Sequence, residues 1–75
     1  EVNFAIYPNP VEDILNISGL EKQMDIRITD IAGKQILSTN SNDNINVSSL
    51  TKGTYFIQII DTETGASSSE KFVKL

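Results

Sequence analysis

The sequence predicts an all-β fold, an antiparallel β-sandwich of about seven short strands. Apolar residues recur at a spacing of two, in short runs bounded by Pro, Gly, Asn and Asp, and this pattern is typical of half-buried strands joined by turns. No long helix is expected, because apolar residues do not recur at a spacing of three or four. The 75 residues suit one small domain, 1–75, with a single layer of core, and regular short strands of this kind favour two packed sheets.

The first three strands are predicted from closely spaced apolar residues. Phe4 and Ile6 indicate the first strand, and Leu15 with Ile17 indicates the second. Residues 24–29 show the clearest alternation in the chain, which places one face inward and the other in water. The apolar face carries Met24, Ile26 and Ile28, and the polar face carries Asp25, Arg27 and Thr29.

A hairpin turn is predicted at Asp30-Ile31-Ala32-Gly33-Lys34. Gly33 can take the positive φ that closes such a turn without a Cβ clash. The fourth strand then returns through Ile36 and Leu37. Residues 39–44 are polar and of the kind that hydrogen-bond their own backbone, so they are expected to form a loop.

The fifth strand is expected at Ile45 and Val47, followed by a turn at 48–50 that places Leu50 under the sheet. Residues 54–60 are the most apolar strand, and both of its faces are apolar, which predicts a central position in its sheet. One face carries Tyr55, Ile57 and Ile59, and the other carries Phe56 and Ile60.

A polar turn at 61–65 leads to the last strand. Lysines on that strand favour an edge position, because they discourage pairing with another sheet. The strand is expected to include Phe72, Val73 and Leu75, with its lysines at 71 and 74.

Four residues near the ends of strands have structural explanations. Gly53 eases a tight bend where its strand begins, and a half-buried Tyr55 packs its ring while its hydroxyl reaches a partner. Pro8 and Pro10 fix φ on either side of Asn9, which suits an extended segment that leads into the sandwich.

Composition excludes several classes of function. Ten acidic and six basic residues give a net charge of −4, which repels phosphates, so no nucleic acid partner is expected. No apolar run approaches the roughly 20 residues that cross a bilayer as a helix, so no direct membrane insertion is expected. Cysteine and histidine are absent, which removes disulfides and the usual zinc ligands. Beginning at Glu1, the chain is expected to be a segment of a longer precursor with its export signal upstream.

Catalytic chemistry is not predicted, and no enzyme activity or cofactor is expected. A serine and lysine pair is conceivable because Ser67-Ser68-Ser69 lies near Lys71, but a flexible polar turn is the favoured interpretation. Oxygen ligands for Ca²⁺ occur at Asp61 and Glu63 and within 40–44. Neither stretch has the spacing of an EF-hand loop, and turn formation is favoured over a metal site.

The order of the short motifs is more specific than any one of them. Over nearly its whole length the chain resembles the type A C-terminal sorting domain of the Bacteroidetes type IX (Por) secretion system. The resemblance rests on Tyr7-Pro8-Asn9-Pro10, on Asp30 with Gly33 and Lys34, on Leu50 followed by Gly53 and Tyr55, and on Lys71-Phe72-Val73-Lys74 at the end.

The resemblance implies an Ig-like β-sandwich at the C-terminus of a cargo protein. Its partners would be the cargo domain on its N-terminal side, the type IX outer-membrane translocon and a sortase-like surface protease that commonly removes the domain. The cargo would pass through the periplasm to the cell surface or the extracellular space. In this family much of the export information lies in the last strands.

The recognised edge is therefore expected at residues 70–75. A final edge strand could add to a sheet of the receptor, with backbone hydrogen bonds giving affinity and side chains giving specificity. The residues concerned are Glu70, Lys71, Phe72, Val73, Lys74 and Leu75.

Two alternatives remain open from the sequence. A carbohydrate-binding or adhesive sandwich has the same size and architecture, but it usually presents exposed aromatics, and most of the aromatics here are expected in strand packing. An Ig-like spacer, needed only to hold a neighbouring domain away from a surface, has no residue pattern of its own.

Overall fold

The computed structural model describes residues 2–75, and within them the predicted all-β sandwich is confirmed. Glu1, on which the expected continuation into an upstream segment rested, lies outside the described residues. The described part forms seven strands. They are β1 (Ala5–Tyr7), β2 (Ile14–Ser18), β3 (Met24–Asp30), β4 (Gln35–Ser41), β5 (Asn44–Asn46), β6 (Gly53–Ile60) and β7 (Ser67–Lys74).

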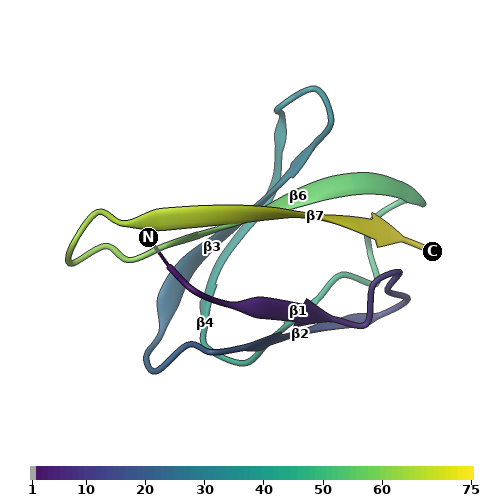
Figure 1. The fold of residues 1–75 in the computed structure, drawn as a ribbon. Helices are drawn as coiled ribbons and strands as arrows, with labels where there is room; N and C mark the ends of the chain where they lie inside the picture. The colour runs from purple at the N-terminus through teal and green to yellow at the C-terminus, as the bar shows by residue number, and fades with distance from the viewer. Residues whose placement is uncertain (1) are drawn as a thin grey trace.

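The strands divide into two antiparallel sheets that face each other (Figure 1). The smaller sheet has the order β1-β2-β5 and the larger has the order β4-β3-β6-β7. The chain crosses between sheets after β2, after β4 and again after β5, as it does in Ig-like sandwiches of three strands against four. β6 is central and β7 is an edge strand, as predicted.

The core lies between the two sheets and follows from period-2 alternation. β3 buries Ile26 and Ile28 while Arg27 faces water. β6 places Ile57 beside Ile28 in the register of the larger sheet, which aligns the buried residues of neighbouring strands. The core consists of Val2, Val11, Leu15, Ile17, Ile26, Ile28, Ile45, Val47, Leu50, Tyr55, Ile57, Ile59 and Phe72.

The β3–β4 hairpin forms at the predicted residues. Gly33 has a φ of 89°, and its N–H donates to the carbonyl of Asp30 at 3.0 Å. The Asp30 carboxylate accepts from the N–H groups of Ala32 and Lys34, each at 2.9 Å. Asp30 therefore organises the turn with both its backbone and its side chain.

Tyr55 ties the start of β6 to the segment that precedes it. Its ring is 6% exposed and stacks on Phe72 with centroids 5.8 Å apart. Its hydroxyl donates to the carbonyl of Thr51 at 2.7 Å. This is the tyrosine corner of Ig-like sandwiches, in which a tyrosine near the start of the sixth strand bonds the backbone a few residues upstream. The expectation of a half-buried ring was wrong, because the ring is buried.

Two stretches expected to be loops are strands. Residues 39–41 belong to β4, and Ser67–Ser69 belong to β7 instead of a flexible turn. Both lie on edge strands whose faces are largely exposed. Pairing with one neighbouring strand supplies their backbone hydrogen bonds, so these residues can form a strand without alternating apolar and polar side chains. Ser69, for example, pairs with Gln58.

The core predicts a large difference between two phenylalanines. Phe72 is fully buried, whereas Phe56 is 39% exposed on the outer face of the same sheet. Phe72→Ala should lower the free energy of unfolding by about 3–5 kcal/mol, because it leaves a cavity beside Tyr55. Phe56→Ala, the matched control, should lower it by less than about 1.5 kcal/mol, since less apolar area is lost. Urea unfolding followed by circular dichroism measures both, and equal losses would contradict this description of the core.

Candidate recognition surface

The residues predicted to carry recognition lie at the end of β7, and the structure divides them by face. Phe72 and Lys74 point into the sandwich and are buried. Lys71 is exposed, Val73 is 37% exposed and Leu75 is 55% exposed. The list is completed by Glu70, which is also exposed.

The burial of Lys74 was not predicted. Its side chain is 7% exposed because an even position on β7 shares the inward face with Phe72. Its Nζ donates to the backbone oxygen of Leu75 at 2.9 Å. The expectation of two edge lysines available to a partner was therefore wrong for Lys74, and Lys71 is the exposed lysine of this strand.

Asn9 covers the edge of β7 with its side chain. Its Nδ2 donates to the carbonyl of Lys71 at 3.3 Å, and its Oδ1 accepts from the N–H of Val73 at 3.0 Å. An amide side chain has both a donor and an acceptor, so it can replace one residue of a neighbouring strand.

Val11 continues this cover. Its N–H donates to the carbonyl of Val73 at 2.9 Å, and its carbonyl accepts from the N–H of Leu75 at 2.8 Å, in a parallel bridge to the end of β7. Its side chain is fully buried between the sheets. The open edge expected at 70–75 is consequently closed from the carbonyl of Lys71 onward, because that carbonyl, both backbone groups of Val73 and the N–H of Leu75 already have partners.

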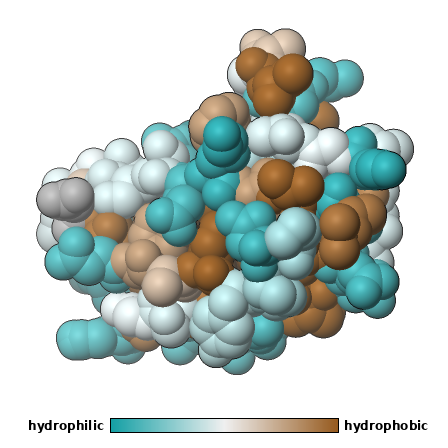
Figure 2. Space-filling model, turned by 45° about the vertical axis from the view of Figure 1, so that its right-hand side comes forward, coloured by the Kyte–Doolittle hydropathy of each residue, from teal (hydrophilic) through white to brown (hydrophobic). Residues whose placement is uncertain are grey.

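We call the surface made by residues 7–11 and 71–75 the clasped end. It lies at the C-terminal end of the sandwich (Figure 1). Tyr7 is 54% exposed there, together with the exposed side chains of Lys71, Val73 and Leu75. Small hydrophobic areas separated by hydrophilic ones cover the side of the molecule seen in Figure 2, where this end comes forward.

Other predicted motif positions contribute mainly to folding. Asp30 and Gly33 form the hairpin turn and Leu50 is buried at 8% exposure. Gly53 has a φ of 154° where β6 begins, and Tyr55 forms the tyrosine corner. Lys34 is exposed, and its backbone closes the hairpin. The exposed motif side chains that share one surface are those of the clasped end.

Sequence reasoning identified both segments of the clasped end but not their contact. The two are 62 residues apart at Asn9 and Lys71. One feature of the sequence could have indicated this contact, the placement of Asn9 between two prolines. Proline has no N–H, so a segment of this kind pairs poorly through its own backbone, and a polar side chain between the prolines can make the bonds instead.

The family model of the secretion system C-terminal sorting domain matches residues 5–75 of this chain. The match includes both segments of the clasped end. The chain belongs to this family, the C-terminal sorting domains of type IX secretion.

A solved structure has the same fold as this sorting domain. It is that of PorZ from Porphyromonas gingivalis, described as an essential bacterial surface component of the type IX secretion system. The TM-score is 0.77 at 23% identity, and the match covers 96% of this chain. The chain spans 11% of the length of PorZ. No curated protein sequence matches the chain.

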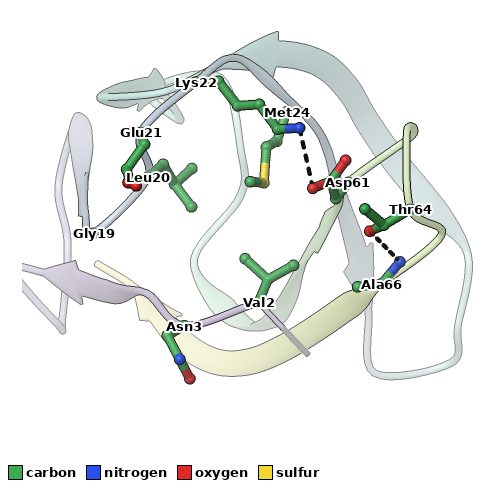
Figure 3. A pocket seen from close by; sticks show the side chains of 10 residues that line it. All are labelled: Val2, Asn3, Gly19, Leu20, Glu21, Lys22, Met24, Asp61, Thr64 and Ala66. Carbon is green, nitrogen blue, oxygen red and sulfur yellow. Dashed lines mark hydrogen bonds and ion pairs between the residues drawn. The ribbon is translucent and has the colours of Figure 1, made fainter.

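The sorting domain also has an open pocket of about 500 Å³, at the end opposite the clasped end. Val2, Leu20 and Met24 form its apolar part, and Lys22 reaches across its rim to Asp61 (Figure 3). Lys22 contacts Asp61 at 3.2 Å and also pairs with Glu63. These contacts join the β2–β3 loop to the β6–β7 turn.

The ion pair shifts the pKa of both partners. Hydrogen bonds to Glu63 and Asp61 raise the pKa of Lys22 above its ordinary value. Desolvation alone would raise the pKa of Asp61, but the N–H of Glu63 and the Lys22 ammonium outweigh it, so the pKa of Asp61 is lowered. The pocket therefore carries a charged rim that links two turns of the fold.

The polar turns form hydrogen bonds within themselves. No three His, Cys, Asp or Glu side chains among residues 2–75 are grouped so as to hold a metal ion. In the Asn-rich turn, the Ser41 hydroxyl accepts from the N–H of Asn44 at 3.3 Å and donates to its carbonyl at 2.8 Å. The described residues also include no helix long and apolar enough to span a membrane.

The aromatic residues divide between core and surface. Tyr55 and Phe72 are buried and Phe4 packs against the core. Tyr7 and Phe56 are exposed. They belong to different sheets, so they do not share one sheet face as the platform of a carbohydrate-binding module would require.

The clasped end predicts a specific effect of Asn9. Asn9→Ala removes the acceptor of the Val73 N–H, so exchange of the Val73 amide with solvent should accelerate, while the Leu75 amide, bonded to Val11, should change less. The free energy of unfolding should fall by about 1–2 kcal/mol for two lost hydrogen bonds. Hydrogen exchange by NMR measures this, and Asn42→Ala is the control for a turn asparagine that does not contact β7. Unchanged Val73 protection would contradict the role of Asn9.

The pocket predicts a pH dependence of stability. A lowered pKa means that Asp61 stabilises the folded state above its unfolded pKa, near 4, and that this contribution is lost as the pH falls through the folded value. Asp61→Asn should therefore flatten the decline in the urea midpoint between about pH 5 and pH 2. Lys22→Met should flatten it in the same direction by a smaller amount, since the Glu63 N–H remains bonded. A slope identical to that of the unmodified domain would refute the assignment.

Proposed function

We propose that the domain directs a cargo protein on its N-terminal side across the outer membrane, and that the translocon recognises the clasped end. One observation carries the proposal. Two motif segments far apart in the sequence, 7–11 and 71–75, meet on one exposed surface. The motif residues between them are largely engaged in the hairpin turn and the tyrosine corner.

Recognition at this surface relies on side chains. The Lys71 carbonyl, both backbone groups of Val73 and the Leu75 N–H are bonded to Asn9 and Val11, so strand addition at this place would require the cover to be removed first. A receptor can instead contact the Lys71 ammonium and the apolar side chains of Val73 and Leu75. A mixed surface of this kind suits specific but reversible binding.

The sorting signal is read from a folded domain. The clasped end exists only when β7 has paired with β6 and the start of the chain has reached β7. A translocon that reads this surface distinguishes a completed domain from an unfolded C-terminal tail.

We propose that this domain is of the type A kind, that its cargo passes through the periplasm to the cell surface or the extracellular space, and that a sortase-like surface protease removes the domain. The domain acts in these steps as a ligand and as a substrate and performs no catalysis.

The test is an export assay on a fusion. Residues 1–75 are placed at the C-terminus of a periplasm-targeted fluorescent protein in a type IX-competent host, beside a strain that lacks the translocon. Fluorescence should reach the surface or the medium only in the competent strain. Lys71→Glu with Val73→Asp should reduce export at least tenfold if each substitution costs about 1 kcal/mol or more of binding.

The control is Lys52→Glu, which reverses the charge of an exposed lysine outside the clasped end. It should leave export unchanged. Circular dichroism of the purified variants establishes that each is folded. Full export by the folded double variant would exclude the clasped end, and retention of the unmodified fusion in the periplasm of the competent strain would exclude the sorting function.

A further inference from the structure

The sandwich has two sides where the edges of the two sheets face each other, and these two sides are covered to different degrees. On one side the segment 9–11 covers the end of β7, and the Val11 side chain fills the space between the sheets. On the other side β4 pairs with β3 alone and β5 pairs with β2 alone. A groove of about 380 Å³ lies between these two edges, lined by residues of 37–46 that include Leu37, Thr39 and Ile45.

The register identifies the free backbone groups of β4. The hairpin closes with the N–H of Asp30 bonded to the carbonyl of Lys34, so alternate residues of β3 from Asp30 backward face β4. Their partners on β4 are Leu37, Thr39 and Ser41. The backbone groups of Ser38 and Asn40 therefore point away from the sheet, and no hydrogen bond within the described residues is made by them.

The β4 edge also lacks the usual protection against pairing. Its residues, Gln35 to Ser41, include no charge and no proline, and edge strands are normally protected by lysine, proline, a bulge or a covering segment. The one irregularity is a bulge near Gln35, which leaves Ser38 and Asn40 in regular register. β7 has a shorter free stretch, 67–70, which carries the charge of Glu70 and is followed directly by Lys71.

We propose that two copies of the domain pair through β4, antiparallel and around a two-fold axis at Thr39. This register places Ser38 of each copy opposite Asn40 of the other, so the free groups of both residues are satisfied. The two Thr39 side chains meet in a non-hydrogen-bonded pair, and Thr with Thr is a favourable cross-strand combination. The larger sheets of the two copies become one continuous sheet.

Charge and symmetry select a second copy as the occupant. An isologous interface must be complementary to itself, and the uncharged strand satisfies this because no like charges face each other. Leu37 and Thr39 border the groove, so pairing covers part of it on both copies.

The expected association is weak and independent of the export function. One pair of short strands buries less than a standard interface, and each copy has a net charge of −4. Measurement at about 0.15 M salt reduces that repulsion, because the Debye length is then about 8 Å.

Two measurements on residues 1–75 test the proposal. Sedimentation equilibrium between about 0.02 and 1 mM should show a concentration-dependent dimer. NMR spectra over the same range should show amide shifts on dilution at Ser38 and Asn40, with smaller shifts at Leu37 and Thr39, whose amides bond β3. A monomer throughout the range, or dilution shifts confined to residues 67–75, would overturn the proposal.

A pair of proline variants tests the same edge. Ser38→Pro removes an outward-facing N–H that β3 does not use, and proline is tolerated at such edge positions. Dimerisation should weaken at least tenfold, whereas Ser69→Pro, an outward position on the free part of β7, should leave it unchanged. Loss of the dimer in Ser69→Pro alone would assign the interface to β7 and overturn the proposal. If Ser38→Pro fails to fold, the dilution shifts of the unmodified domain decide the question.

Discussion

Four hydrogen bonds join the segment 9–11, near the beginning of this domain, to its last five residues. They link Asn9 and Val11 to the backbone of Lys71, Val73 and Leu75. An edge strand presents a row of unpaired donors and acceptors, and small sandwiches must protect or cover them. Here the cover comes from a short segment flanked by prolines, which also places the buried Val11 side chain between the sheets. The closed side of the sandwich and the composition of the clasped end both depend on these bonds.

This arrangement makes a C-terminal signal depend on the whole domain. The last residues are held by contacts with residues more than 60 positions earlier, so they take their places only when the sandwich is complete. A domain of this size is only marginally stable. A surface built from its two ends forms only when the domain has folded. The chain belongs to the family of type IX sorting domains, and under the function proposed above this dependence would let export select cargo with an intact domain.

The sequence was informative wherever a local rule decides the structure. Alternation at 24–29 located β3 and its inward face, and the apolar faces of 54–60 located the central strand. Gly33 was assigned correctly because a tight hairpin turn requires a positive φ. The rule is weaker on edge strands, where one face or both are exposed. For that reason the C-terminal end of β4, residues 39–41, and the beginning of β7 at Ser67 were mistaken for loops.

The candidate recognition surface was only partly predictable. Residues 70–75 were proposed from the terminal motif, but the division between Lys71 and Lys74 depends on which face of β7 meets the core. The contact between Asn9 and Val73 is made by a side chain across a long sequence separation, and no periodicity in a single sequence records it. The physical requirement that the edge be covered becomes evident only when the sheet order is known.

The most direct test of the clasped end as the recognised surface is site-specific photo-crosslinking in an export-competent cell. A photoreactive residue is placed at Lys71, on the clasped end, or at Lys52, outside it, in a fusion that is otherwise unmodified. The account predicts crosslinks from position 71 to an outer-membrane component of the translocon and none from position 52. Crosslinks to the translocon from position 52 and none from position 71, in a fusion that is still exported, would show that recognition lies elsewhere on the domain.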